Sequence, residues 1–188
     1  MIDFEKLKDA LVKAATAAGI EQYEIYFKTA RDAMAEALGD EISGFSFGVS
    51  GGICFRCIFG GRMGYASTEL MTTDEMRELV LRAVENAKHI ESDDEVFIYP
   101  GSSEYGKKTA QPVEFPDAAL LKNNALALQQ STYAKSKSVT DGTQSRVFAY
   151  ETETRIFNSK GLSLANTAGM TGGFVRAVVK VDGESADD

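Results

Sequence analysis

The sequence has 188 residues, with 20 Lys and Arg against 28 Asp and Glu, a net charge of −8, and 44% hydrophobic residues. Nucleic-acid backbones are bound by clustered Lys and Arg, so this composition argues against DNA or RNA as a partner. No apolar run approaches the roughly 20 residues that cross a bilayer, and the amphipathic N-terminus is unlike a secretory signal. With two cysteines that give no disulfide framework, we expect a cytoplasmic protein of one large or two small domains.

The first predicted element is a helix over Asp3–Ala18. Its apolar residues recur at 3.6-residue spacing. Asp3 is placed to cap the first turn, and Gly19 is placed to end the helix in the left-handed conformation. The alternation that follows over residues 21–30 predicts a strand.

A hairpin is predicted next. Residues 31–38 favour a helix by propensity alone, because they are rich in Ala, Met, Glu and Leu. The turn at Gly39-Asp40 and the alternation over residues 41–48 favour two paired strands, and this is the interpretation that we adopt.

Two glycine pairs, Gly51-Gly52 and Gly60-Gly61, bracket the β-rich segment 53–59. Gly-Gly loops supply the positive φ angles of primed turns, so both pairs are interpreted as hairpin turns. A phosphate-binding loop would need a helix directly behind it, which neither pair has. The capping box Thr72-x-x-Glu75 then starts a second helix, which runs to Ile90.

Residues 92–115 read as a connector that carries one short strand over Val96–Tyr99. Pro116 suits the first turn of a third helix. The expected buried face of that helix consists of Ala118, Leu121, Ala125 and Leu128.

The last part of the chain predicts strands again. These strands cover residues 146–157, 162–170 and 174–181, and turns separate them at 158–161 and 171–173. The tail 183–188 is acidic and built of small residues, which predicts either a disordered end or a cut point.

Strands that are joined by hairpins rather than by βαβ crossovers indicate an α+β fold, with helices packed on mostly antiparallel, hairpin-connected sheets. The expected organisation is an N-terminal α+β subdomain over residues 1–92, a connector over 93–116, and a helix with antiparallel strands over 117–188. We expect the last part to stop before a C-terminal domain.

Cys54 and Cys57 have the CxxC spacing of metal knuckles and redox pairs. On a strand, however, residues three apart point to opposite faces, and the flanking glycines favour a strand. No second cysteine pair exists, and His89, the single histidine, is distant in sequence. We therefore expect two unrelated thiols, one of them buried, and no zinc site.

His89 lies near the end of the second predicted helix, where it could serve as a general base or a metal ligand. The structural alternative, which we favour, is an interaction with the partial negative charge of the helix C-terminus. The acidic run 91–95 lacks the glycine and the distant glutamate of an EF-hand loop, so it is interpreted as a solvated loop rather than a calcium site. The residues alone therefore assign no catalytic, cofactor-binding or metal residue, and do not make this chain a self-sufficient enzyme.

The segment 52–68, GICFRCIFGGRMGYAST, resembles the N-terminal region of the TldD/PmbA family, often called modulators of DNA gyrase. That family carries a segment of the form G-V-x-x-R-V-x-x-G-R-x-G-F-A-S-T followed by a helix, and Tyr65 stands here for its aromatic residue. Asn158-Ser159-Lys160-Gly161 is similar to the family's N-S-x-G turn, in the form closer to PmbA-like members.

The resemblance implies a metallopeptidase-type system in which TldD-like and PmbA-like subunits pair as homo- or hetero-oligomers around a peptide substrate. The family's zinc-type metal ligands, a His-Glu-x-x-x-His helix and a later Cys, belong to TldD-like members and lie downstream of this region. No catalytic residue and no cofactor is therefore carried over to this chain. The implied role is non-catalytic and consists of subunit pairing and a contribution to the peptide-access cavity.

A different function is compatible with the strand-rich C-terminal third. A stand-alone module could bind peptides by adding a strand at an exposed sheet edge. The residues that carry the resemblance also have structural interpretations. Gly61 and Gly64 serve tight geometry, and Arg56 either faces solvent or pairs with an acidic neighbour.

Overall fold

The computed structural model describes residues 3–92, 94–102, 105, 114–181 and 184–187. The chain divides into two compact units. Unit 1 comprises Met1–Thr29, Ser50–Ala110 and Glu153–Thr167, and unit 2 comprises Ala30–Val49, Gln111–Thr152 and Ala168–Asp188. The division at residues 92 and 116 that the sequence suggests stays a prediction.

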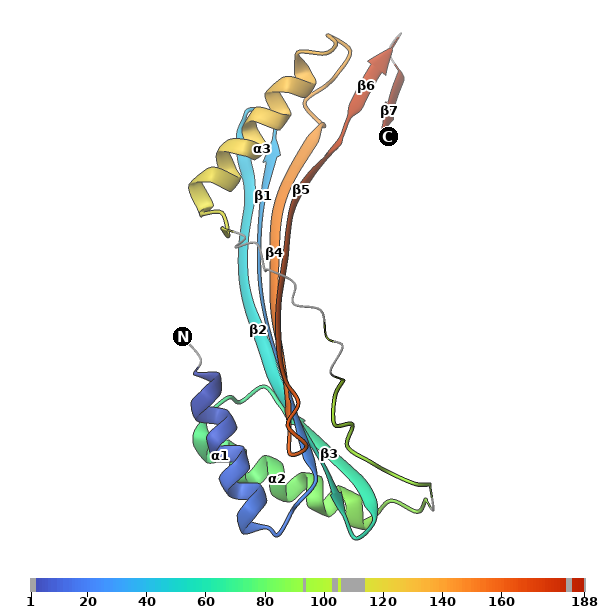
Figure 1. Ribbon diagram of the computed structural model, residues 1–188. Coiled ribbons are helices and arrows are strands. Elements are labelled where there is room, and N and C mark those ends of the chain that lie inside the picture. Colours follow the sequence, from blue (N-terminus) through green and yellow to red (C-terminus); the bar gives the residue numbers. More distant parts are fainter. Residues whose placement is uncertain (1–2, 93, 103–104, 106–113, 182–183, 188) are drawn as a thin grey trace. The chain divides into compact units, whose positions relative to one another are not determined.

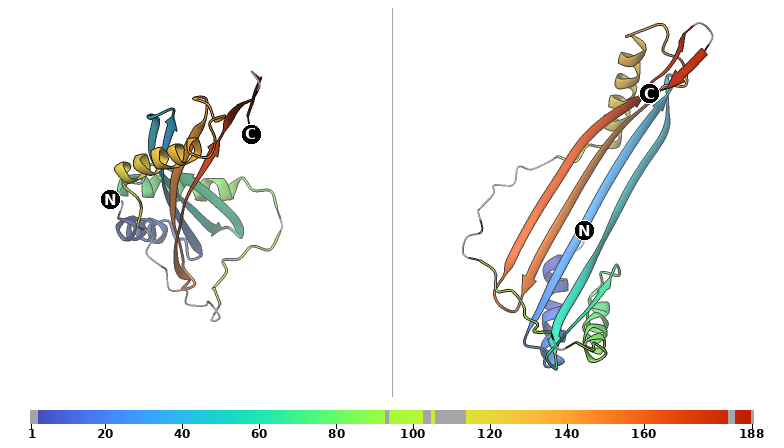
Figure 2. Two further views of the ribbon diagram at one scale, coloured as in Figure 1. Left: turned by 90° about the horizontal axis from the view of Figure 1, so that it is seen from above. Right: turned by 90° about the vertical axis from the view of Figure 1, so that its right-hand side faces the viewer.

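The described residues form an α+β fold (Figure 1). Its elements are α1 (Phe4–Ala17), β1 (Tyr23–Leu38), β2 (Glu41–Phe59), β3 (Arg62–Thr68), α2 (Thr73–Lys88), α3 (Ala118–Tyr133), β4 (Gln144–Asn158), β5 (Ser163–Arg176), β6 (Val178–Val181) and β7 (Glu184–Asp187). The first five strands form one sheet in the order β3-β2-β1-β4-β5, and β6 pairs antiparallel with β7. Figure 2 shows the neighbouring strands of the large sheet side by side. The predicted fold class is confirmed.

Unit 1 has its apolar core between the two N-terminal helices and the sheet. The side chain of Asp3 caps α1 by accepting a hydrogen bond from the Lys6 N–H, and Gly19 follows the helix with φ +71°, both as predicted. The largest fully buried apolar side chains of this core are Leu11, Ile25, Phe27, Ile53, Phe55, Met76, Leu79 and Val80. Each of them stabilises the fold by about 1.5–3 kcal/mol through its removal from water.

Unit 2 has a second core beneath α3. Small residues of β1 (Ala33, Ala35 and Ala37) pack against Leu121 and Ala125. Asp117 caps α3 by accepting a hydrogen bond from the Leu120 N–H, so Pro116 precedes the cap rather than lying in the first turn. The third buried residue of the helix is Gln129, while the expected Ala118 is exposed and Leu128 is only partly buried.

The predicted strand break at Gly51-Gly52 is wrong, because both residues lie inside β2. A Cβ added to Gly51 would lie 2.7 Å from the Lys28 carbonyl oxygen, and one added to Gly52 would lie 2.9 Å from the Thr68 carbonyl oxygen. These glycines therefore permit close approach of neighbouring backbones rather than a turn.

The predicted turn at 171–173 is wrong for the same reason, since β5 continues through it to Arg176. A Cβ on Gly172 would lie 2.8 Å from the Phe148 ring, which occupies the space over it. The hairpin turns at Gly39-Asp40, Gly60-Gly61 and 158–161 are confirmed, with positive φ at Gly39, Gly60, Gly61 and Gly161.

The predicted short strand over Val96–Tyr99 is absent, since the described connector residues 94–102 have no strand. Ile98 is buried there, and the Tyr99 carbonyl accepts a hydrogen bond from the Asn158 side chain. A side-chain donor thus satisfies this backbone group where a neighbouring strand would otherwise do so. The acidic tail contributes β7 over Glu184–Asp187.

Candidate functional site

The two cysteines of the CxxC spacing lie on β2, and their side chains are separated by its alternation. Cys57 is fully buried in the core of unit 1, whereas Cys54 is partly exposed. Burial raises the pKa of the Cys57 thiol to about 11, and burial also raises the pKa of Cys54. Both groups therefore remain protonated at neutral pH, as two unrelated thiols of the predicted kind.

His89 is the C-cap residue of α2, at the predicted helix end. Its ring Nε2 lies 3.1 Å from Oε1 of Glu85, one turn earlier. A hydrogen bond from Lys88 and the contact with His89 lower the pKa of the Glu85 carboxyl. In the acidic run, the Ser92 hydroxyl donates to Asp94, and residue 93 lies outside the described residues.

No metal-ligand cluster occurs among the residues that the structure describes, since no three His, Cys, Asp or Glu side chains converge there. The two cysteines are held on opposite faces of a strand, and His89 is engaged with Glu85 at a helix end. These residues therefore do not fit the zinc-type ion that a metallopeptidase would hold.

The segment GRMGYAST forms a tight turn and the strand β3. Gly60 and Gly61 have φ +58° and +77°, which a two-residue hairpin loop requires. Gly64 lies where α2 packs on β3, and a Cβ added there would stand 2.0 Å from the Ala83 carbonyl oxygen. The glycines of this segment thus fix the hairpin and the approach of the helix.

β3 is the end strand of the sheet, so among the described residues its outer edge has no strand partner, and we call this its free edge. Tyr65 exposes 64% of its surface, and the Asn86 side-chain amide donates to the Tyr65 carbonyl at 2.8 Å. Alternate residues of an antiparallel strand direct their backbone groups to the same side, so Met63 and Ser67 also direct theirs away from β2. A groove of about 420 Å³ beside this edge is lined by Tyr65, Ala66, Ser67, Arg82, Glu85 and Asn86.

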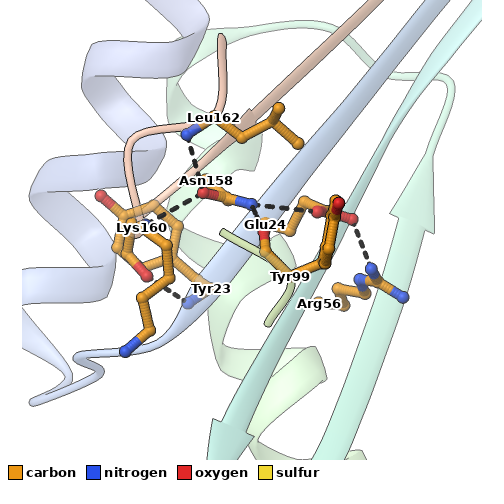
Figure 3. Close-up of polar contacts among 8 residues, drawn as sticks. Tyr23, Glu24, Arg56, Tyr99, Asn158, Lys160 and Leu162 are labelled. Carbon is orange, nitrogen blue, oxygen red and sulfur yellow. Dashed lines mark hydrogen bonds and ion pairs between the residues drawn. The ribbon is translucent and has the colours of Figure 1, made fainter. Parts of the chain in front are cut away.

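A buried polar cluster joins four segments of unit 1 around Glu24 (Figure 3). Glu24 is 5% exposed, and its Oε1 forms an ion pair with Arg56 at 2.6 Å. Its Oε2 accepts a hydrogen bond from the Asn158 amide at 3.3 Å, and that amide also donates to the Tyr99 carbonyl at 2.7 Å. Arg56 therefore pairs with an acidic neighbour, one of the two alternatives that the sequence left open.

The turn Asn158-Ser159-Lys160-Gly161 is fixed by its own side chains. The Asn158 Oδ1 accepts hydrogen bonds from the N–H groups of Lys160 and Leu162. The Ser159 hydroxyl accepts one from the Tyr23 N–H, and the Ser159 N–H donates to the Tyr23 carbonyl. The N-S-x-G sequence thus holds the β4–β5 turn against the start of β1.

The contacts of the Glu24 cluster hold β1, β2, the connector and the β4–β5 turn together. Both carboxylate oxygens of Glu24 are engaged, Oε1 in the ion pair with Arg56 and Oε2 in the hydrogen bond from Asn158. Glu24 was not identified from the sequence as a special residue. The available signal was the position of this charged residue between Tyr23 and Ile25, which are both buried. A carboxylate that is buried with its neighbours needs a hydrogen-bonding or charged partner.

Residues 23–87, which span β1 to α2, match the family model described as PmbA/TldA metallopeptidase domain 1. Among proteins of curated function, none matches the chain. None of the described helices is long and apolar enough to cross a membrane.

Several solved structures share the fold. One is TldE from Thermococcus kodakarensis, with a TM-score of 0.74 and 18% sequence identity over 96% of this chain and 40% of that chain. Another is a protein named as a modulator of DNA gyrase from Thermotoga maritima, with a TM-score of 0.75 and 18% sequence identity over 98% of this chain and 42% of that chain. A protein of the same description from Bacteroides thetaiotaomicron has a TM-score of 0.72 and 20% sequence identity over 100% of this chain and 45% of that chain. This chain thus spans less than half the length of each, and at these identities the likeness shows the fold.

Proposed function

Because this chain carries the N-terminal region of the TldD/PmbA family, we propose that it serves a TldD/PmbA-type metallopeptidase system as a non-catalytic part. In this role it pairs with a TldD- or PmbA-like subunit and forms walls of the cavity through which peptides reach the active site. The match of residues 23–87 to the first domain of the family carries the proposal.

The chemistry of the titratable residues supports a non-catalytic role. The thiols of Cys54 and Cys57 have raised pKa values, and Glu24 is engaged on both oxygens. We propose that any zinc-type metal of the system is held by the TldD-like subunit and that this chain binds no cofactor. The free cysteines are in keeping with a reducing compartment, and we place the system in the cytoplasm.

A reconstitution experiment tests this role. The purified chain, a TldD-like subunit and their mixture are each incubated with an unfolded peptide, with and without a chelator, and the assembly is followed by size-exclusion chromatography with light scattering. We expect no chelator-sensitive cleavage by the chain alone and co-elution with the TldD-like subunit. Chelator-sensitive cleavage by the chain alone, or separate elution of the two proteins, would overturn the proposal.

The free edge of β3 favours a second candidate function, the capture of extended peptides by strand addition. The backbone N–H and C=O groups of Met63 and Ser67 point away from β2, beside the groove. The Tyr65 carbonyl between them accepts a hydrogen bond from the Asn86 side-chain amide. A peptide that adds here would displace the Asn86 amide. Titration with extended peptides should shift the backbone amide resonances of β3 in NMR spectra, and unchanged β3 resonances across a broad peptide panel would contradict it.

A further inference from the structure

The outer edge of β2 in unit 2 has no strand beside it among the described residues, and residues 42–49 of the strand carry no charge themselves. β3 pairs with β2 only from Ile53 to Phe59, so within the described part of the chain residues 41–49 have a strand neighbour on the β1 side alone. No charged residue occurs in the sequence between Glu41 and Arg56. Figure 2 shows this part of β2 at the margin of the sheet.

Large apolar side chains stand on this edge. Phe45, Phe47 and Val49 are 40%, 59% and 64% exposed. Phe45 faces the Lys122 ammonium of α3, and Phe47 contacts the Phe115 ring just before α3, so the two aromatic side chains lie on the α3 face. Soluble proteins protect such edges with charges, proline or bulges, because a bare edge templates pairing with another strand. Residues 42–49 contain neither a charge nor proline.

We propose that a second copy of this chain pairs with this edge, strand β2 against strand β2, in an antiparallel arrangement with a two-fold axis at Ser46. This inference specifies the surface for the subunit pairing proposed above and rests on that role. A two-fold interface brings the same surface of both copies together, so the strand must be complementary to itself.

The residue pattern of β2 meets that requirement. In this register Phe45 of each copy lies opposite Phe47 of the other, and cross-strand aromatic pairs stabilise antiparallel sheets. On the other face Gly44 lies opposite Gly48, and Ser46 lies opposite its own equivalent. Each copy carries a net charge of −8, which opposes association in general, yet this strand places no charge opposite a charge.

The opposite edge of the sheet, β5, is the competing surface. It is also uncharged between Lys160 and Arg176. β5, Ser163–Arg176, contains three glycines and a single aromatic residue, Phe174, whose ring already has the Arg146 guanidinium over it. It therefore offers at most one self-paired aromatic contact, against two for β2. The β2 edge is therefore the better self-complementary strand.

The test measures self-association of the full chain by sedimentation equilibrium for the wild type and for Ser46→Lys and Ser46→Asp. Either substitution places like charges directly opposite each other across the proposed axis, so we expect both to raise the dimer dissociation constant roughly tenfold or more. Asn124, an exposed residue of α3, provides matched controls, since Asn124→Lys and Asn124→Asp change the net charge equally away from the edge. We expect the dissociation constants of these controls to stay within a factor of about two of the wild type.

The outcomes separate the explanations. A wild type that stays monomeric would overturn the proposal. Dissociation constants of the Ser46 variants that equal those of the Asn124 variants would also overturn it, because only the net charge would then matter. So would weakening by Thr171→Lys on β5 without weakening at Ser46. Hydrogen exchange of the wild type gives an independent readout, since the β2 edge amides of residues 43–49 should exchange more slowly as protein concentration rises, and concentration-independent exchange would contradict the pairing.

The role proposed for the whole chain can fail separately. If the wild type dimerises through Ser46 but does not co-elute with a TldD-like subunit, the metallopeptidase role fails and the β2 pairing stands. If it co-elutes with that subunit while Ser46 variants self-associate like the wild type, the role stands and the β2 pairing fails.

Discussion

The side-chain amide of Asn158 lies 3.3 Å from the buried carboxylate of Glu24, across 134 residues of sequence. The same side chain donates to the Tyr99 carbonyl and accepts from the N–H groups of Lys160 and Leu162. One residue thus connects the β4–β5 turn, the connector and β1 of unit 1. It is 1% exposed, so little water is available to replace these bonds.

Replacement of Asn158 by Ala should destabilise the chain by about 2–3 kcal/mol, because it leaves the Glu24 carboxylate short of a donor and two backbone N–H groups without an acceptor. The measurement is urea unfolding followed by circular dichroism. Asn166→Ala, at an exposed position of β5, is the matched control and should stay within about 0.5 kcal/mol of the wild type. Equal losses in both variants would show that the hydrogen bonds of Asn158 contribute nothing specific.

Gly64→Ala should be poorly tolerated, since its Cβ would lie 2.0 Å from the Ala83 carbonyl oxygen and 2.6 Å from the Ala87 Cβ. We expect α2 to be displaced from β3 at a cost of about 2–3 kcal/mol in unfolding free energy. Gly44→Ala in β2 is the control, because its nearest contact would be an ordinary 3.7 Å from the Glu36 Cβ, and its effect should stay within about 1 kcal/mol. If Gly64→Ala unfolds at the same denaturant concentration as Gly44→Ala, close packing does not explain the glycine.

Local signals predicted much of the fold. The Asp3 cap, the positive φ of Gly61 and the capping interaction of Thr72 each depend on residues within three or four positions along the chain. By contrast, Gly52 and Gly172 are required by the Thr68 carbonyl and the Phe148 ring, which approach from other strands. Their sequence context resembles a turn, and only the pairing of strands distinguishes the two roles.

The polar cluster was beyond prediction for a related reason. The sequence leaves open whether Arg56 faces solvent or pairs with an acidic neighbour, because it contains 28 Asp and Glu residues and gives no register between β1 and β2. The family resemblance identified the turn at Asn158 as characteristic, yet its partner Glu24 follows from the sheet alone. Long-range pairing, rather than residue type, decides which polar groups become buried together.

Gln129 is a second case in which long-range contacts bury a polar group, here in unit 2. Its amide is fully buried on α3, where helical spacing predicted the apolar Leu128. Its Nε2 donates to the Thr143 carbonyl at 2.6 Å, and its Oε1 accepts from the Ser145 hydroxyl. Gln129→Met keeps the volume but leaves those groups unpaired, so we expect a loss of about 2–3 kcal/mol. Gln130→Met, at the exposed neighbouring position, should change the unfolding free energy by less than about 0.5 kcal/mol. A neutral Gln129→Met would mean that water or another donor substitutes for the amide.

The Cys57 thiol should make stability fall at high pH. Burial raises its pKa from 9.0 to about 11, so the folded chain holds this proton at pH values where the unfolded chain has lost it. The stabilisation is complete below about pH 9 and is lost as the pH rises through about 11, with a total of about 3 kcal/mol, of which about 2 kcal/mol is lost by pH 11.

The measurement compares Cys57→Ala with its parent, both in a Cys54→Ala background so that Cys57 is the single thiol that differs. Urea unfolding at about pH 8 and about pH 11 gives the free-energy difference between the two proteins at each pH. The parent should be more stable at the lower pH, because the alanine leaves a cavity. That difference should narrow by about 2 kcal/mol at the higher pH. There the Cys57 thiol is ionised in the unfolded parent but is still largely protonated in the folded parent, which favours unfolding of the parent and has no counterpart in the alanine variant. A difference that is constant with pH would show that the thiol ionises as easily in the core as in the unfolded chain.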